Sequence, residues 1–224
     1  MKRGAIRSSV RYALLFGLMF SSGLSAWASE ILLDDYKGGL SPKWTEKSFN
    51  KGNTSYQITR EDNFLCIKAQ SSSAASALYY EIKYDPRQYP FLHWRWKVGH
   101  VISRGDAHHK QGDDYAARIY VVFPSFMFWK TRAINYIWAN KLPLGHAVPN
   151  PFTANAIMIA VESGSDRAGQ WVKERRNVLE DYRRYFGKEP PKVGAVAIMT
   201  DTDNTGEDAT AWYGPIWISN RSHK

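Results

Sequence analysis

The chain has 224 residues, of which 44% are hydrophobic and 23% are charged. This is an ordinary globular composition, and it excludes an intrinsically disordered chain and a membrane protein with many spans. Thirty Lys and Arg residues against 21 Asp and Glu residues give a formal net charge of +9 at pH 7, and four of the basic residues lie within the first eleven positions.

Residues 1–28 have the pattern of an export signal. A basic start is followed by an apolar stretch over 12–20, and Ala26-Trp27-Ala28 matches a cleavage site between small residues. The apolar stretch is about half of the roughly 20 residues that cross a bilayer, so we expect a cleaved signal peptide and no transmembrane segment after cleavage. The protein is therefore expected to be exported, to the periplasm of a host with two membranes or to the exterior.

Residues 29–224 are expected to form a single domain. Residues 1–28 carry four basic residues and no acidic one, so their removal leaves 196 residues with a formal charge of +5. One core suffices for an all-β chain of this length. Export and the small charge argue against a nucleic-acid partner, although the pI of the full sequence is about 9.5. The one cysteine, Cys66, lies in an alternating apolar stretch and is expected to be a buried thiol.

Alternation with a period of two residues predicts most of the strands. In segment 90–98, Leu92, Trp94, Trp96 and Val98 point to one face, and Phe91, His93, Arg95 and Lys97 point to the other. Nine further segments have strand character: 55–60, 63–69, 77–84, 115–123, 132–139, 156–163, 170–175, 193–200 and 211–219. Turn residues at 60–63 and at 164–169 predict two hairpins.

A single short helix is predicted over 178–186. Asn177 is its N-cap, Glu180 stands at the third position, and Gly187 ends it. About ten short strands with one helix predict an all-β fold. We expect a two-sheet antiparallel β-sandwich of jelly-roll type, with Trp94 and Trp96 between the sheets.

A polar patch is predicted on an outward-facing sheet surface. In segment 115–123, alternation places Arg118 and Tyr120 opposite the apolar face, just as it places His93 and Arg95 in segment 90–98. If the two strands are neighbours in one sheet, these four side chains share one surface. Planar donors, carboxylates and exposed rings are the groups that recognise saccharides. The loop residues Asp113 and Asp114 and the rings of Trp138, Tyr136 and Trp217 are candidates to complete such a site.

The segment 201–208 is an acidic loop that follows an apolar strand. Asp201, Asp203 and Asn204 supply the oxygen atoms that Ca²⁺ prefers, although Trp212 stands where a helix-loop-helix calcium site has Glu. Three interpretations stay open: a calcium site, an acidic turn, or carboxylates that point into a sugar site.

Four segments, in this order along the chain, resemble a bacterial family known as domain of unknown function 3047. They are GDDYAARIYVVF (112–123), NYIWAN (135–140), PNPFT (149–153) and AIMTDTDNTG (197–206). The resemblance covers nearly the whole chain after residue 28, and it implies a carbohydrate-binding-like jelly roll without an established activity.

The chain is also similar, more loosely, to sugar-binding sandwich modules. The similarity lies in the acidic start Asp34-Asp35-Tyr36 and in the W-x-W-K-V pattern of 94–98. Such modules often hold a structural calcium ion between the acidic start and the last strand. Pro215 stands where an acidic ligand of that ion is expected, so the chain departs from the pattern at this point.

The leading hypothesis is an exported cell-envelope protein that binds a carbohydrate or similar ligand, without catalysis, on a sheet face or loop rim. The candidate ligand contacts are Arg95, Asp113, Asp114, Arg118, Tyr120, Trp138, Asp201, Asp203 and Asn204, and the candidate metal ligands are Asp201 and Asp203. One alternative is an enzyme acting on an acidic glycan. A lyase would use Arg118 with Tyr120 or His93, and a hydrolase would use two carboxylates among Asp114, Glu162 and Asp201. The other alternative is a structural envelope protein, in which these polar residues pair with one another.

Overall fold

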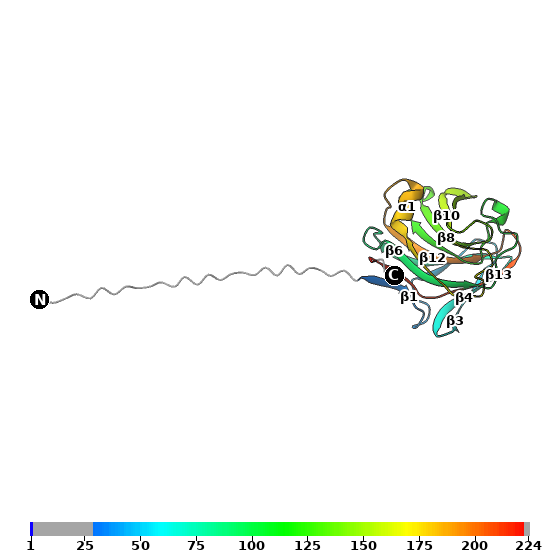
Figure 1. The fold of residues 1–224 in the computed structure, drawn as a ribbon, viewed down its shortest axis with the longest axis horizontal. Coiled ribbons are helices and arrows are strands. Elements are labelled where there is room, and N and C mark those ends of the chain that lie inside the picture. The colour runs from blue at the N-terminus through cyan, green and yellow to red at the C-terminus, as the bar shows by residue number, and fades with distance from the viewer. Residues whose placement is uncertain (2–28, 222–224) are drawn as a thin grey trace.

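The computed structural model describes Met1 and residues 29–221, and in this part of the chain fourteen strands form two seven-stranded sheets packed face to face (Figure 1). The predicted signal peptide, apart from Met1, lies outside the described residues. Within the described residues, no helix combines the length and the apolar character needed to cross a membrane.

Sheet A has the strand order β1-β14-β6-β13-β4-β3, and β11 pairs with β6. Its strands are β1 (Glu30–Asp34), β3 (Ser55–Glu61), β4 (Phe64–Ser72), β6 (Phe91–Val98), β11 (Val172–Asn177), β13 (Asp208–Tyr213) and β14 (Ile216–Ser219). Sheet B has the order β2-β5-β12-β7-β8-β10-β9. Its strands are β2 (Trp44–Ser48), β5 (Ala75–Tyr84), β7 (Arg118–Phe123), β8 (Arg132–Ala139), β9 (Ala147–Asn150), β10 (Thr153–Ser163) and β12 (Val193–Asp201).

Two aromatic contacts join the sheets at the centre of the core. The ring of Trp94 in β6 stacks on Tyr136 in β8 with 5.4 Å between ring centroids, and the centroids of Trp96 and Trp138 lie 5.9 Å apart. All four side chains are fully buried. The inward orientation predicted for Trp94 and Trp96 is confirmed, because β6 alternates between the core and the outer face of sheet A.

The helix α1 (Val178–Phe186) covers one end of the sandwich (Figure 1). As predicted, the Asn177 side chain accepts a hydrogen bond from the backbone N–H of Glu180, and Gly187 ends the helix with a φ of 62°. The helix presents Tyr182 to Phe123 of β7, with 4.5 Å between ring centroids.

Several connections differ from those predicted. The turn at 164–169 does not form a hairpin, because it carries the chain from β10 in sheet B to β11 in sheet A. Strands β8 and β10 are parallel, since β10 folds back from β9 and inserts between β9 and β8.

The segment 211–219, predicted as one strand, is split into β13 and β14 at Gly214 and Pro215. Pro215 has no backbone N–H for the ladder, and Gly214 approaches Arg95 so closely that a Cβ atom would lie 2.4 Å from its Cγ.

Three short strands were not predicted from the sequence. β1, β2 and β9 have four or five residues each and lie at sheet edges. Short edge strands bury few side chains, so their sequences show only weak alternation of apolar and polar residues.

The thiol of Cys66 is buried, as expected from the sequence. Burial raises its pKa to about 11.

Replacement of Trp96 by alanine is expected to lower the free energy of unfolding by about 3–5 kcal/mol, because it opens a cavity between the sheets. Urea unfolding measures this change. The matched control is Trp217→Ala, which removes a half-buried ring from the outer face of sheet A. An equal cost for the two variants would contradict the central role of the contact between Trp96 and Trp138.

Candidate functional site

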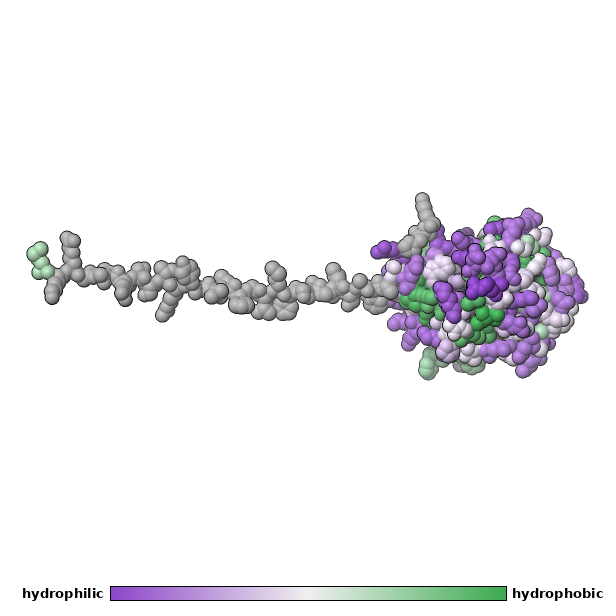
Figure 2. Space-filling view, turned by 90° about the horizontal axis from the view of Figure 1, so that it is seen from below, coloured by the Kyte–Doolittle hydropathy of each residue, from purple (hydrophilic) through white to green (hydrophobic). Residues whose placement is uncertain are grey.

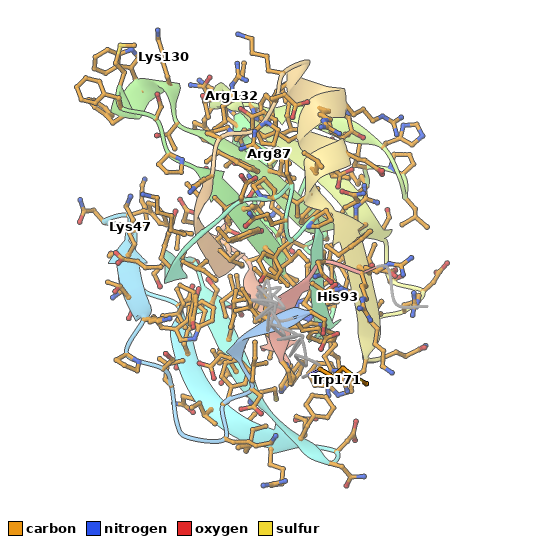
Figure 3. The ribbon with its side chains drawn as sticks, turned by 90° about the vertical axis from the view of Figure 1, so that its left-hand side faces the viewer. Lys47, Arg87, His93, Lys130, Arg132 and Trp171 are labelled. Carbon is orange, nitrogen blue, oxygen red and sulfur yellow. The ribbon has the colours of Figure 1, made fainter. Side chains whose placement is uncertain are left out.

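The two strands that carry the predicted polar patch lie in different sheets. Strand β6 belongs to sheet A and β7 belongs to sheet B, and each turns its apolar face to the shared core. His93 and Arg95 therefore point out of sheet A, whereas Arg118 and Tyr120 point out of sheet B on the opposite side. The prediction that Arg95 shares one surface with Arg118 and Tyr120 is wrong. In Figure 3, Lys47 of sheet B lies near the left edge of the molecule, whereas His93 of sheet A lies to the right of the centre.

Arg95 and Trp138 are thereby separated from the other predicted site residues. The guanidinium of Arg95 lies over the ring of Phe64, 4.6 Å from its centroid, on the outer face of sheet A. Trp138 is fully buried in the core, and its indole N–H donates to the carbonyl of Gly164 at 3.0 Å. A buried ring has no face for a ligand, so the prediction of Trp138 as a stacking residue is wrong.

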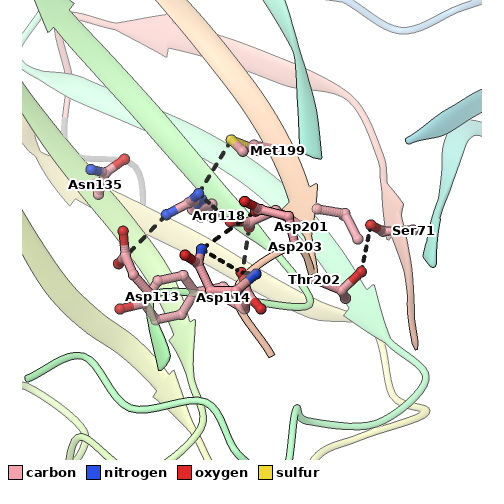
Figure 4. A network of polar contacts seen from close by, with 12 residues as sticks. Ser71, Asp113, Asp114, Arg118, Asn135, Met199, Asp201, Thr202 and Asp203 are labelled. Atoms are coloured by element: carbon pink, nitrogen blue, oxygen red, sulfur yellow. Dashed lines mark hydrogen bonds and ion pairs between the residues drawn. The ribbon is translucent and has the colours of Figure 1, made fainter. Parts of the chain in front are cut away.

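Most of the remaining predicted residues do come together, at one end of β7 and β12 (Figure 4). We call Asp113, Asp114, Asp201 and Asp203 the acidic cluster. The guanidinium of Arg118 is buried beside it, forms an ion pair with Asp201, and lies 3.9 Å from a carboxylate oxygen of Asp113. The rings of Tyr115 and Tyr120 flank this guanidinium at 5.1 and 5.3 Å.

The buried carboxylate of Asp114 binds the acidic loop, residues 201–208. Its carboxylate accepts hydrogen bonds from the backbone N–H of Thr205 at 2.6 Å and from the side-chain amide of Asn204 at 3.0 Å. Asp113 similarly accepts from the side-chain amide of Asn150 at 2.8 Å. Asp113, Asp114, Arg118 and Asp201 are all buried, whereas Asn204 is exposed and Asp203 is half-buried. These buried groups therefore pair within the protein, as the structural alternative predicts.

The acidic cluster carries more negative than positive charge. Burial raises the pKa of Asp113 despite the opposing effect of Arg118, and burial together with the nearby Asp114 raises the pKa of Asp203. Burial also raises the pKa of Asp201 well above its ordinary value, although Arg118 opposes this. Four carboxylates face one guanidinium, so bound protons or a cation would lower the electrostatic energy of the cluster.

The acidic cluster partly fits a metal ion. Side-chain oxygen atoms of Asp114, Asp201 and Asp203 lie within 4.8 Å of one another, and hard cations prefer such ligands. Asp201 and Asp203 were predicted from the sequence, and only the fold adds Asp114. The fit is limited, because Arg118 and the 204–205 backbone already bind some of these oxygens.

The second calcium position, at the acidic start of the chain, does not fit an ion. The carboxylate of Asp34 accepts hydrogen bonds from the backbone of Tyr36 and Ser41 and from the indole N–H of Trp44, at 2.8 to 3.1 Å. Asp35 forms an ion pair with Lys37 at 2.7 Å. Asp34 therefore organises the loop between β1 and β2.

A groove of about 880 Å³ lies on the outer face of sheet B. We call it the sheet B groove, and its lining includes Thr45, Lys47, Tyr79, Glu81, Val122, Pro124, Lys192, Gly194 and Ala195. The sequence analysis missed this groove. A signal was present, because alternation in β5 places Tyr79, Glu81 and Lys83 on the face opposite Leu78 and Tyr80.

Strand register connects the sheet B groove to Tyr120. Ala197 of β12 pairs with Tyr79 of β5 on one side and with Tyr120 of β7 on the other. Both tyrosines are half-buried, and they pack against a small cluster of Ala75, Ala77 and Met199. Ala197 is fully buried beneath these side chains, and the ring of Tyr120 lies next to Arg118.

The family described as "Protein of unknown function (DUF3047)" matches residues 42–217, and the chain belongs to this family. No curated protein matches the sequence.

Several solved structures are similar in fold. The family 11 carbohydrate-binding module of the cellulosomal cellulase Lic26A-Cel5E of Clostridium thermocellum has 11% sequence identity and a TM-score of 0.50, over 88% of this chain and 99% of that chain. The module CBM27-1 of Caldicellulosiruptor saccharolyticus in complex with mannohexaose has 12% identity and a TM-score of 0.44, over 88% and 100% of the two chains. At these identities the likeness concerns the fold alone, a β-sandwich like that of carbohydrate-binding modules.

Replacement of Arg118 by methionine is expected to lower the free energy of unfolding by about 3–5 kcal/mol, since it leaves Asp201 buried without its counter-ion. The double variant Arg118→Met/Asp201→Asn should recover part of this loss. Urea unfolding of the two single variants and the double variant gives the coupling energy. Strictly additive costs would show that the ion pair between Arg118 and Asp201 does not stabilise the fold.

Proposed function

We propose that this member of the family is an exported protein, periplasmic or secreted, that binds a carbohydrate without catalysis across the outer face of sheet B. The observation that carries the proposal is the sheet B groove, which the half-buried ring of Tyr79 lines. Aromatic rings offer apolar faces to the C–H surface of a sugar, and nearby charged groups bind its hydroxyls. The groove supplies both kinds of group, with Lys47, Glu81 and Lys192 beside Tyr79.

The groove is also large enough for a short oligosaccharide. Its volume of about 880 Å³ lies within the range of roughly 300–1,000 Å³ found for small-molecule sites. The Clostridium thermocellum protein of similar fold is a carbohydrate-binding module, and we extend this ligand class to the present chain as part of the proposal.

In this proposal the predicted polar residues take two different roles. Tyr120 contacts the ligand, and the exposed Asn204 and the half-buried Asp203 extend the polar rim of the same face. Arg118, Asp113, Asp114 and Asp201 lie beneath the surface and fix the position of Tyr120 and of the 201–208 loop. In the lyase alternative His93 cannot act together with Arg118, because it lies on the opposite face of the sandwich. Tyr120 does lie beside Arg118, but the guanidinium of Arg118 is buried and paired with Asp201.

Tyr79→Ala is expected to weaken glycan binding by at least about tenfold, or about 1.4 kcal/mol, because it removes the ring from the floor of the groove. The ligand is first identified on a glycan array, and its affinity is then measured by calorimetry. The matched control is Trp212→Ala, which removes a half-buried ring from the outer face of sheet A.

Loss of binding in Trp212→Ala but not in Tyr79→Ala would place the site on sheet A. Binding to no glycan at all would favour the structural alternative. Release of new reducing ends or unsaturated sugars from a bound glycan would show an enzyme.

We further propose that Ca²⁺ binds Asp114, Asp201 and Asp203 and fixes the 201–208 loop. Added Ca²⁺ should raise the Tm of the protein, because it binds the folded chain only. Asp203→Asn should abolish this increase.

The same variant tests the charge of the acidic cluster without metal. The pKa of Asp203 is raised in the folded chain, so its ionisation above about pH 4 costs stability. At pH 7 and in chelator, Asp203→Asn should therefore raise the Tm, because the variant removes the cost of ionising this carboxyl in the folded chain. A Tm of the parent protein that Ca²⁺ leaves unchanged would remove the calcium proposal.

A further inference from the structure

The loop between β7 and β8 exposes three aromatic side chains. We call residues 124–131 the aromatic loop. Phe126 is fully exposed, and Phe128 and Trp129 are 79% and 59% exposed. A single exposed apolar residue is normal on a protein surface, but three within four consecutive positions form an apolar projection that water solvates poorly.

Hydrogen bonds hold the aromatic loop in this shape. Residues Phe128–Lys130 form a short 3₁₀ turn, in which the backbone N–H of Lys130 donates to Met127 at 2.8 Å and that of Thr131 donates to Phe128 at 3.0 Å. The side chain of Asn155 in β10 donates to the carbonyl of Trp129 at 2.7 Å. These bonds pair several backbone groups of the loop within the protein, which lowers the cost of moving them from water into a less polar layer.

Basic residues lie at the aromatic loop. Lys130 is exposed and directly follows Trp129, and Arg132 begins the next strand. Residues 124–131 themselves contain no Asp or Glu. In Figure 3, Lys130 lies at a corner of the molecule beside side chains that project outward. Pro124 at the start of the loop lines the sheet B groove, where Lys47, Lys83 and Lys192 outnumber Glu46 and Glu81.

We propose that the aromatic loop inserts into the interfacial layer of a membrane that contains anionic phospholipids. Phe and Trp rings partition into this layer, and flanking Lys side chains reach the phosphate groups. The projecting turn, the absence of acidic residues within it and the excess of Lys beside it fit a negatively charged lipid surface better than they fit a flat protein interface. The insertion would hold the sheet B groove next to the membrane, but it does not require that the groove binds a glycan.

The experiment measures co-sedimentation of the purified protein with vesicles of phosphatidylcholine alone and of phosphatidylcholine with phosphatidylglycerol. We expect binding to the anionic vesicles. The variant Phe126→Ser/Phe128→Ser/Trp129→Ser should reduce the partition coefficient by at least about tenfold, because it removes most of the apolar area that enters the lipid. The replaced side chains make few contacts in the folded chain, so the variant should keep the parent Tm.

The matched control is Leu32→Ser/Leu40→Ser/Ile58→Ser, which removes three other exposed apolar side chains. Leu32 and Ile58 belong to β1 and β3. These strands lie on the side of the molecule seen in Figure 2, where hydrophilic side chains surround a hydrophobic area. This control should bind vesicles within about twofold of the parent protein, because apolar area away from the loop does not enter the lipid.

Failure of the parent protein to bind anionic vesicles would overturn the proposal, as would equal losses in the two triple variants. A change in sedimentation coefficient of the aromatic-loop variant without lipid would point instead to self-association through the loop. Glycan affinity is measured on the same variants. It should be unchanged in the aromatic-loop variant, so failure of the membrane proposal and failure of the glycan proposal give different results.

Discussion

The packing of Trp94 and Trp96 in β6 against Tyr136 and Trp138 in β8 is the contact on which the rest of the structure depends. It brings the two sheets together at their centres, and all four rings belong to the hydrophobic cluster that fills the space between the sheets. Because both strands turn their large rings inward, their remaining side chains must face outward on opposite sides of the sandwich. The two outer faces, and with them every candidate ligand surface, follow from this one arrangement.

The outer face of sheet B differs from an ordinary solvated sheet surface in two ways. At one end, Arg118 and the acidic cluster form a buried polar network that the loops at 113–115 and 201–208 cover. In the middle, Gly194 and the small side chain of Ala195 leave a groove open beside Tyr79. A rigid buried network next to an open groove keeps the ring of Tyr120 in a fixed position, and pre-ordered side chains lower the entropic cost of binding a ligand.

Some of the predicted site residues are close together in the chain, and others are brought together only by the pairing of strands. Asp113, Asp114, Arg118 and Tyr120 are close in the chain, and Asp201, Asp203 and Asn204 form one loop, so each group was found from its own segment. That the two groups meet depends on the antiparallel pairing of β7 with β12. Arg95 was grouped with Arg118 by the same kind of reasoning, and it lies on the other sheet.

Local sequence determined the elements of this protein. Alternation identified the inward face of β6 and most of the strands, and capping residues fixed both ends of α1, because these signals depend on neighbours within a few residues. Tertiary structure alone decided which strands share a sheet, where the 164–169 turn leads, and that Tyr79 and Tyr120 flank Ala197. Strand pairing is decided by contacts between residues far apart in the chain, and a period of two residues is the same whichever sheet a strand joins.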